Sequence, residues 1–220
     1  TLAVEDLEPS LRVAIVLPPD PGLAELAPAA PQAQFLSVNI PDIAPGGNIS
    51  VLADTDRPDI AAFISGYIAA MISEDYHAGL MIPKDDALGQ ITLAAFRKGF
   101  EYYCGTCNPY ILPPWCTITP CYPQHVDIPA DEDPTTYNAY SDFLILQRQV
   151  ETMYVSPQFA TPELLTYLSS SGVLVVSDFT PTQILGNWVA TIQPDVVAAI
   201  ELAWADLAAG VGGKSVTSPL

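Results

Sequence analysis

The amino-acid sequence predicts an α/β fold in which parallel sheets are covered on both faces by helices. Short, almost wholly apolar runs bounded by turn residues are typical of strands that are buried on both faces. These runs alternate along the chain with helical patterns, and such alternation is typical of right-handed crossovers between parallel strands. With 220 residues, of which 50% are hydrophobic, the chain is long and apolar enough to bury a sizeable core.

The elements follow from these patterns in chain order. The predicted strands are residues 11–17, 33–39, 78–83, 151–157, 172–179 and, as a sixth, 187–192. The predicted helices are residues 58–73, 88–103, 136–149, 162–170 and 195–209. The first of these helices is apolar almost all round, which favours burial or packing between two bodies. Its start is well defined, because Pro58 and Asp59 suit the first turn of a helix.

Residues 105–135 interrupt this alternation with seven prolines. We expect this segment to be an insertion at the surface, cross-linked by its own cysteines. The cysteines are Cys104, Cys107, Cys116 and Cys121. Disulfides are favoured, and they would place the protein outside the cytoplasm. A zinc site is a weaker alternative, because only the first pair has the tight C-x-x-C spacing, and free thiols are the third. The acidic run "DIPADEDP" is interpreted as solvated, with calcium as a minor alternative.

Charge and motifs exclude several classes of function. The 25 acidic and 7 basic residues give a net charge of -18, which disfavours unassisted binding to nucleic acid or to an anionic membrane. The tail "AAGVGGKSV" resembles the end of a phosphate-binding loop, but it follows a helix, so we interpret it as a helix C-cap before a frayed terminus. No nucleophile, metal or dinucleotide motif is found, and neither His77 nor His125 has a catalytic setting. We therefore expect no enzyme activity, no cofactor and no metal, although a hydrolase that uses paired carboxylates stays open.

The loops that follow the predicted strands are the candidate ligand site, because open parallel sheets bind ligands at their carboxyl ends. These loops are "PPDPG", "PKDDALGQ", "SPQFATP" and "SDFTPTQ". Asp178 and Phe179 are the most suggestive pair, since an acid can accept hydrogen bonds from a sugar or amine while a ring stacks on a base. The alternative for Asp178 is a turn or helix cap, and for Lys84, Asp85 and Asp86 it is a solvated loop beside a cap.

The order of several segments resembles one known family. These segments are "APQAQFLSVNI", "HAGLMIP", "LAAFRKGFEYYCG", "LLTYLSSSGVLVVSDFTP" and "NWVATIQPDVVAAIELAWADLAAGVGG". Together they are similar to the basic membrane protein type of ABC-transporter substrate-binding lipoproteins, which have the type I periplasmic-binding-protein fold. The chain departs from the family in three ways. It has no counterpart of the family's first strands before Leu11, it has "PKDD" where the family has a glycine pair, and its cysteine-bearing insertion is not typical.

This resemblance implies two hinged lobes and a chain shortened at its N-terminus. Residues 1–74, with part of the tail 187–220, would form lobe one, and residues 75–186, with the insertion 105–135, would form lobe two. A small polar solute, with a nucleoside as the best-known class, would be captured by hinge closure. The implied ligand contacts are Asp20, Lys84, Asp85, Ser156, Gln158, Asp178 and Phe179.

The resemblance also implies partners and a location. The solute would pass to an ABC permease, and the protein would be extracellular or periplasmic, held to the membrane only through a lipid anchor outside this chain. Two alternatives use the same α/β scaffold: the extracellular sensor of a receptor or regulatory module, and a carboxylate-based enzyme.

Overall fold

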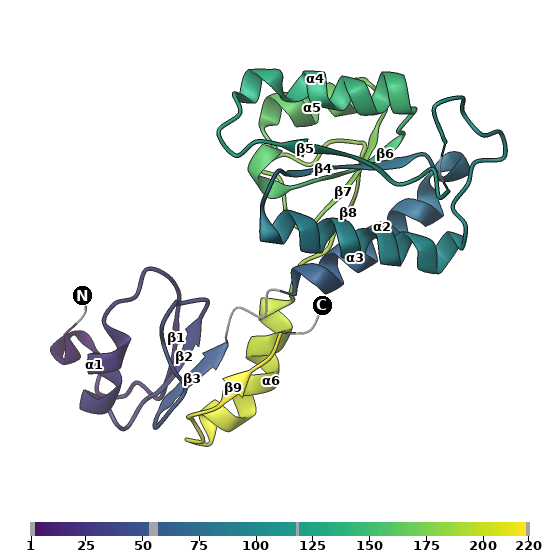
Figure 1. The fold of residues 1–220 in the computed structure, drawn as a ribbon. Coiled ribbons are helices and arrows are strands. Elements are labelled where there is room, and N and C mark those ends of the chain that lie inside the picture. Colours follow the sequence, from purple (N-terminus) through teal and green to yellow (C-terminus); the bar gives the residue numbers. More distant parts are fainter. Residues whose placement is uncertain (1–2, 53–56, 118, 219–220) are drawn as a thin grey trace. The chain divides into compact units, whose positions relative to one another are not determined.

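The computed structural model of the protein describes residues 3–52, 57–117 and 119–218. The chain divides into two compact units, each with its own sheet (Figure 1). Unit 1 comprises residues 1–56 and 194–220, and unit 2 comprises residues 57–193. Every strand pairing within the two sheets is parallel, and helices lie on the faces of both. The predicted α/β fold class is therefore confirmed.

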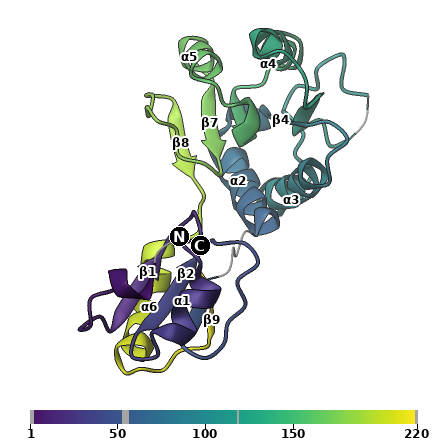
Figure 2. The ribbon, with the colours of Figure 1, turned by 90° about the vertical axis from the view of Figure 1, so that its left-hand side faces the viewer.

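Unit 1 has a sheet of strand order β1-β2-β3-β9. The strands are β1 (Val13–Val16), β2 (Gln34–Val38), β3 (Ile49–Leu52) and β9 (Ser215–Val216), and the helices are η1 (Val4–Asp6), α1 (Leu23–Ala29) and α6 (Val196–Ala208). Side chains of β2 alternate between the two faces: Phe35 packs with residues of α1, and Leu36 and Val38 pack with residues of α6. Figure 2 shows α1 and α6 on opposite faces of this sheet.

Asn48 holds the end of α1 to the loop that leads into β3. Its Nδ2 donates toward the carbonyl oxygens of Ala27, Ala30 and Ala33, at 2.9, 3.2 and 2.8 Å. We expect Asn48→Ala to lower the free energy of unfolding by about 1–3 kcal/mol, because three partly buried carbonyls each lose a hydrogen bond. Urea unfolding measures this, with Asn138→Ala on α4 as the control, since no described residue bonds to the Asn138 side chain. Equal losses in the two variants would contradict the role of Asn48.

Unit 2 has a sheet of strand order β5-β4-β6-β7-β8. The strands are β4 (Ala78–Pro83), β5 (Gln124–Ile128), β6 (Thr152–Val155), β7 (Leu174–Ser177) and β8 (Trp188–Thr191). The helices are α2 (Pro58–Ile72), α3 (Ala87–Cys104), α4 (Tyr137–Asp142), α5 (Pro162–Ser170) and the short η2 (Glu74–Tyr76), η3 (Pro134–Thr136), η4 (Phe143–Gln147) and η5 (Pro157–Phe159). Helices α2 and α3 cover one face of the sheet, and α4 and α5 cover the other (Figure 1). The largest core lies here, since buried residues of the sheet and its helices form one cluster.

The boundaries of the compact units differ from those of the expected lobes. Helix α2 packs along α3, so the contacts group it with unit 2, whereas residues 1–74 were expected to form lobe one. Strand β8 pairs with β7 and also belongs to unit 2, whereas part of the tail 187–220 was expected in lobe one. The helix near residue 58 was expected to be buried or to pack between two bodies, and its apolar surface packs against α3 and the sheet of unit 2.

All six predicted strands are present, each trimmed at its ends except β4. The hydrophobic pattern did not predict the strands β3, β5 and β9, which are short or partly exposed. It also did not predict the helix α1, which is brief and contains Pro28. The helix predicted over residues 136–149 is instead α4 followed by a π-helical turn, η4. The tail was wrongly expected to fray. Its β9 pairs with Val51 and Leu52 of β3, after Gly210 takes a left-handed conformation (φ +77°) beyond α6.

The insertion is held by two disulfides, Cys104–Cys107 and Cys116–Cys121. This confirms the disulfide prediction, and the described residues contain no group of three or more His, Cys, Asp or Glu placed to hold a metal. The insertion is more than a surface excursion, because Cys107, Cys121 and Tyr122 are at most 2% exposed and join the core of unit 2. Its last part supplies the edge strand β5. In the described part of the chain no helix is both long and apolar enough to cross a membrane.

Candidate ligand-binding site in unit 2

The strand order of unit 2 reverses direction between β4 and β6. The crossover through α3 places β5 on one side of β4, and the later strands β6, β7 and β8 are added on its other side. At such a reversal the connections leave the sheet in opposite directions, which opens a crevice at the carboxyl ends of the strands. Lys84, Ser156 and Asp178 follow β4, β6 and β7 directly, so the topology brings these predicted residues to one edge of the sheet.

Four side chains form a polar cluster at this edge, namely Thr92, Tyr154, Ser156 and Asp178. The buried Tyr154 hydroxyl is hydrogen-bonded to Asp178, and it also interacts with Ser156 and with Thr92 of α3. Ser177 Oγ donates to the carbonyl oxygen of Val155 at 2.7 Å, and it lies 3.4 Å from Asp178 Oδ1. Asp178 itself is only half-buried. One side of its carboxylate is therefore held by the protein, and the residue still has access to solvent.

The electrostatics of this cluster are those of a carboxylate close to the core. Burial raises the pKa of Asp178, while hydrogen bonds from Tyr154 and Ser177 act in the opposite direction. Burial also raises the pKa of Tyr154, and the negative charge of Asp178 adds to this effect. Tyr154 thus stays a neutral donor toward the carboxylate. A hydroxyl or amine of a ligand could bind to the remaining, solvent-accessible carboxylate oxygen through a charge-assisted hydrogen bond.

An aromatic pair adjoins the polar cluster. The rings of Phe179 and Trp188 meet edge to face with centroids 5.1 Å apart, and the Trp188 indole nitrogen donates to Thr191 Oγ1 at 2.9 Å. Phe179 also lines a cavity of about 300 Å³ beside η5 and α5, together with Pro157 and Leu165. The half-buried Phe179 therefore offers an apolar surface next to the Asp178 carboxylate.

The loop after β4 borders a second cavity. Lys84 is exposed and lines a cavity of about 560 Å³ with Asp127, Tyr140 and other residues of β5 and α4. Asp85 is exposed in a left-handed turn (φ +55°), and Asp86 caps α3 by accepting a hydrogen bond from the Gly89 amide at 2.9 Å. In this loop, Asp86 has the structural role of a cap, while Lys84 and Asp85 are free to contact a ligand.

The remaining predicted residues have different settings. Gln158 is exposed in η5, and no described residue bonds to its side chain. Asp20 lies in unit 1, where its Oδ1 accepts hydrogen bonds from the amides of Gly22 and Leu23 at 3.0 and 2.9 Å. These bonds give Asp20 a role at the start of α1. Ser156 and Asp178 are thus the two predicted residues that the structure joins through one hydrogen-bonding partner.

Three residues at this edge were missed from the sequence, namely Thr92, Tyr154 and Trp188. Tyr154 lies in an apolar strand and Thr92 in an amphipathic helix, so both were interpreted as core or cover residues. A signal was present for Tyr154, because it precedes Ser156 by two residues and therefore faces the same side of the sheet. For Trp188, the sequence provided no indication that its ring meets Phe179.

This chain is similar to known proteins in structure, whereas comparisons of its sequence found no match. No family model matches the chain, and no curated protein matches it. A solute-binding protein of an ABC transporter system from Conexibacter woesei DSM 14684 is similar at 12% identity and a TM-score of 0.56, over 88% of this chain and 60% of that one. A transcriptional activator of the comK gene from Bacillus halodurans is similar at 15% identity and a TM-score of 0.57, over 94% and 66%. A solute-binding protein from Aeropyrum pernix K1 has a TM-score of 0.48 at 17% identity, over 89% and 54%.

These likenesses show the fold alone, which is that of periplasmic-binding-protein-like α/β proteins. The chain spans 60% of the length of the Conexibacter protein and 54% of the Aeropyrum protein.

Proposed function

We propose that this chain is the solute-capturing part of an extracytoplasmic solute-binding protein. The observation that supports this most strongly is the polar cluster around Asp178, which lies at the carboxyl edge of a parallel sheet where the strand order reverses. A similar fold occurs in a solute-binding protein of an ABC transporter system. The basic membrane protein type remains the family to which we assign it, on the order of its segments.

The capture mechanism that we propose is closure around the solute. The chain leaves unit 1 after β3 and leaves unit 2 after β8, so both connections begin at carboxyl ends of strands. The unit 2 residues that we propose to contact the solute are Lys84, Asp85, Ser156, Gln158, Asp178 and Phe179. A solute shifts such an equilibrium only by as much as it binds the closed state more tightly than the open one.

The ligand class that we propose is a small polar solute with hydroxyl donors and a flat apolar part, and a nucleoside is the first example to test. Asp178 would accept hydrogen bonds from sugar hydroxyls, and Phe179 would pack against the base. The net charge of -18 favours neutral or cationic solutes at this site. We expect this site to bind its solute without turnover.

Location and partners follow from the same proposal. Two disulfides favour an oxidising, extracytoplasmic compartment. The partner would be an ABC permease, and any attachment to the membrane would be through a lipid anchor outside this chain.

A solute screen tests the proposal. Thermal unfolding should be followed with a panel of nucleosides, sugars and amino acids, and native mass spectrometry should identify any solute retained after purification. A true ligand at about 100 times its Kd is expected to stabilise the protein by roughly 2.7 kcal/mol, which raises Tm by several degrees. A panel in which no solute shifts Tm, with no retained solute in the mass spectrum, would remove the main support for solute capture.

The second candidate is the ligand-sensing module of a receptor or regulator. It is favoured by the similar fold of a transcriptional activator. Both candidates predict solute binding, so they are separated by the partner. Stimulation of ATP hydrolysis by a reconstituted ABC permease is expected for the first and not for the second.

A further inference from the structure

A cavity of about 440 Å³ lies near the amino ends of the unit 2 strands, at the opposite edge from the polar cluster. Its wall combines α3, the cross-linked insertion, the start of β5 and the residue that follows η4. The charged and aromatic residues in this wall are Arg97, Glu101, Trp115, Tyr122, His125 and Arg148. This cavity therefore has two of the chain's seven basic residues and one of its two histidines in its wall. The protein as a whole has 25 acidic residues, so such a grouping of basic residues is unusual.

The two arginines are unusual because they are half-buried and unpaired. Arg57, Lys98 and Lys214 each form an ion pair with a carboxylate, but Arg97 and Arg148 form none in the described part of the chain. Arg12 and Lys84 are exposed, so water can solvate their charges. A half-buried guanidinium that lacks an anionic partner is disfavoured unless something else compensates it.

Their surroundings hold both guanidinium groups in place. The Arg148 carbon Cζ lies 4.9 Å from the ring centroids of Trp115 and Phe143, and no described residue accepts a hydrogen bond from the Arg148 side chain. Arg97 has one polar partner among the described residues, since its Nη2 lies 3.3 Å from Nδ1 of His125. This geometry makes Nδ1 the acceptor, and the Arg97 guanidinium keeps its other donors for a ligand.

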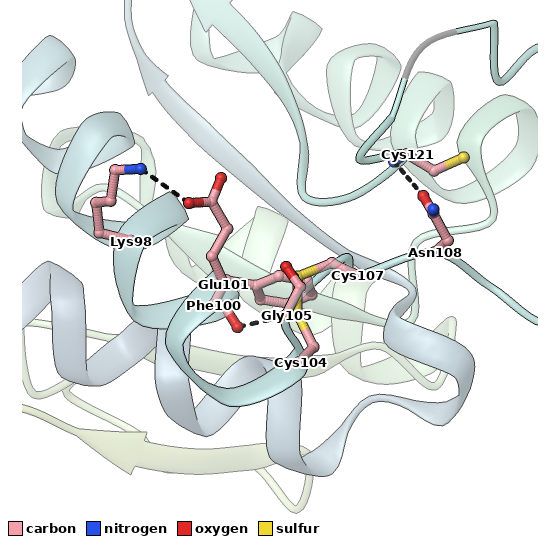
Figure 3. Close-up of a disulfide and its surroundings, with 8 residues drawn as sticks. All are labelled: Lys98, Phe100, Glu101, Cys104, Gly105, Cys107, Asn108 and Cys121. Carbon is pink, nitrogen blue, oxygen red and sulfur yellow. Dashed lines mark hydrogen bonds and ion pairs between the residues drawn. A yellow bond between two sulfur atoms is a disulfide. The ribbon is translucent and has the colours of Figure 1, made fainter.

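Cross-links fix the insertion that closes the cavity. The Cys116–Cys121 disulfide lies in its wall, and the Tyr122 hydroxyl donates to the Arg148 carbonyl oxygen at 2.8 Å. The Cys121 amide donates to Asn108 Oδ1 at 3.3 Å, just beyond the Cys104–Cys107 disulfide (Figure 3). A site whose donors are held in position before binding loses less conformational freedom when a ligand arrives.

Negatively charged side chains also lie near the cavity. Glu101 is in the wall, but it accepts a hydrogen bond from Lys98 at 2.9 Å (Figure 3). Asp127 lies 3.8 Å from Nε2 of His125. Burial and the nearby Arg97 lower the pKa of His125, so at neutral pH the positive charge of the site comes from the two arginines.

We propose that this cavity binds a small oxyanion, either free phosphate or the carboxylate or phosphate group of a small molecule. A guanidinium donates to such groups through paired N–H bonds, and the Trp115 ring, which lies against Arg148 in the wall, would pack on an apolar part of the same ligand. The net charge of -18 acts against anions at long range, but salt screens that field within roughly 8–10 Å. Within the cavity, the two arginines therefore have the larger effect on whether an anion binds. This site is separate from the proposed solute site at the carboxyl ends of the strands.

Isothermal titration calorimetry of the oxidised protein tests this proposal. The probes are inorganic phosphate and succinate, with sodium chloride added to keep ionic strength constant. We expect Arg97→Gln and Arg148→Gln each to weaken binding of the better probe about tenfold or more, since each removes a charge-assisted hydrogen bond. Arg57→Gln removes the same charge from the exposed start of α2, and its affinity should stay within about twofold. Glu101→Gln should strengthen binding, because it removes a negative charge from the wall.

The calorimetry can either support or overturn the proposed anion site. Binding of phosphate or succinate that falls in both cavity variants, but not in Arg57→Gln, supports the site, and the preferred probe identifies the anion class. No binding of either probe, or equal weakening by Arg57→Gln, overturns it. Arg148→Gln also loses its ring contacts, so circular dichroism must show that it is folded, and Arg97→Gln alone then carries the test if it is not. Asp178→Asn should leave phosphate binding unchanged, which separates this result from the outcome for the solute site.

Discussion

Gly99→Ala is expected to lower the free energy of unfolding by about 3 kcal/mol. Helices α2 and α3 cross at two glycines, each of which faces the backbone of the other helix. A Cβ atom on Gly99 would lie 1.8 Å from the Phe63 carbonyl oxygen, and one on Gly66 would lie 2.1 Å from the Phe96 carbonyl oxygen. Backbone atoms cannot rotate away as a side chain can. The helices would have to separate, and the packing of α2 and α3 would be lost along much of their length.

The direction of the change in unfolding free energy shows whether Gly99 is closely packed or exposed. In an exposed helix, replacing glycine with alanine adds roughly 0.5–1 kcal/mol of stability, because the unfolded chain loses freedom. Gly186→Ala, in a turn, is the control, since apart from its chain neighbours no described atom lies within 4 Å of its added Cβ. Its free energy of unfolding in urea should stay within about 0.5 kcal/mol of the parent value. A Gly99→Ala protein as stable as the control would show that α2 and α3 do not approach this closely.

Asp178→Asn is expected to weaken solute binding about 10- to 100-fold, because a hydrogen bond to a charged acceptor is replaced by one to a neutral amide. Calorimetry measures this with adenosine first, and then with whichever solute of the panel raises Tm most. The control is Asp131→Asn, which makes the same change of charge at an exposed residue. We expect that variant to bind the solute like the parent. Equal affinity of the parent and Asp178→Asn would contradict the assignment of Asp178 to the site.

The same variant has a distinct effect on stability. Burial raises the pKa of Asp178, so the folded protein binds a proton at this residue more tightly than the unfolded chain does. The stabilising effect is complete below the ordinary aspartate pKa of about 4, and it is lost as pH rises through the raised value. At pH 7 Asp178→Asn removes a charge that burial disfavours. It should therefore unfold at the parent's urea midpoint or above it, while at pH 3 the difference should disappear.

A loss of binding without a loss of stability would identify Asp178 as a functional residue. If Asp178→Asn instead destabilised the protein at pH 7, the carboxylate would serve the fold, as the helix cap Asp86 does. Asp131→Asn under the same conditions separates this effect from the change in net charge.

Some of the residues at the carboxyl edge of the unit 2 sheet could be predicted from the sequence. Lys84, Ser156 and Asp178 could be placed there because the strands before them are apolar runs, and parallel strands end at the same edge of a sheet. Tyr154 was not recognised, since a tyrosine in a buried strand looks the same whether its hydroxyl meets a backbone carbonyl or a carboxylate. Only the packing of β6 beside β7 brings that hydroxyl to Asp178.

The sequence by itself determined the α/β class, six of the strands and most of the helices between them, because buried strands and amphipathic helices have a periodic pattern of hydrophobicity. It also determined that the cysteines favour disulfides, through their spacing and the prolines around them. Tertiary structure alone decided the short strands β3, β5 and β9, since their hydrogen-bonding partners, not their own residues, make them strands. It alone also brought Arg97 and Arg148 to one cavity, because proximity between residues on different elements has no local pattern along the chain.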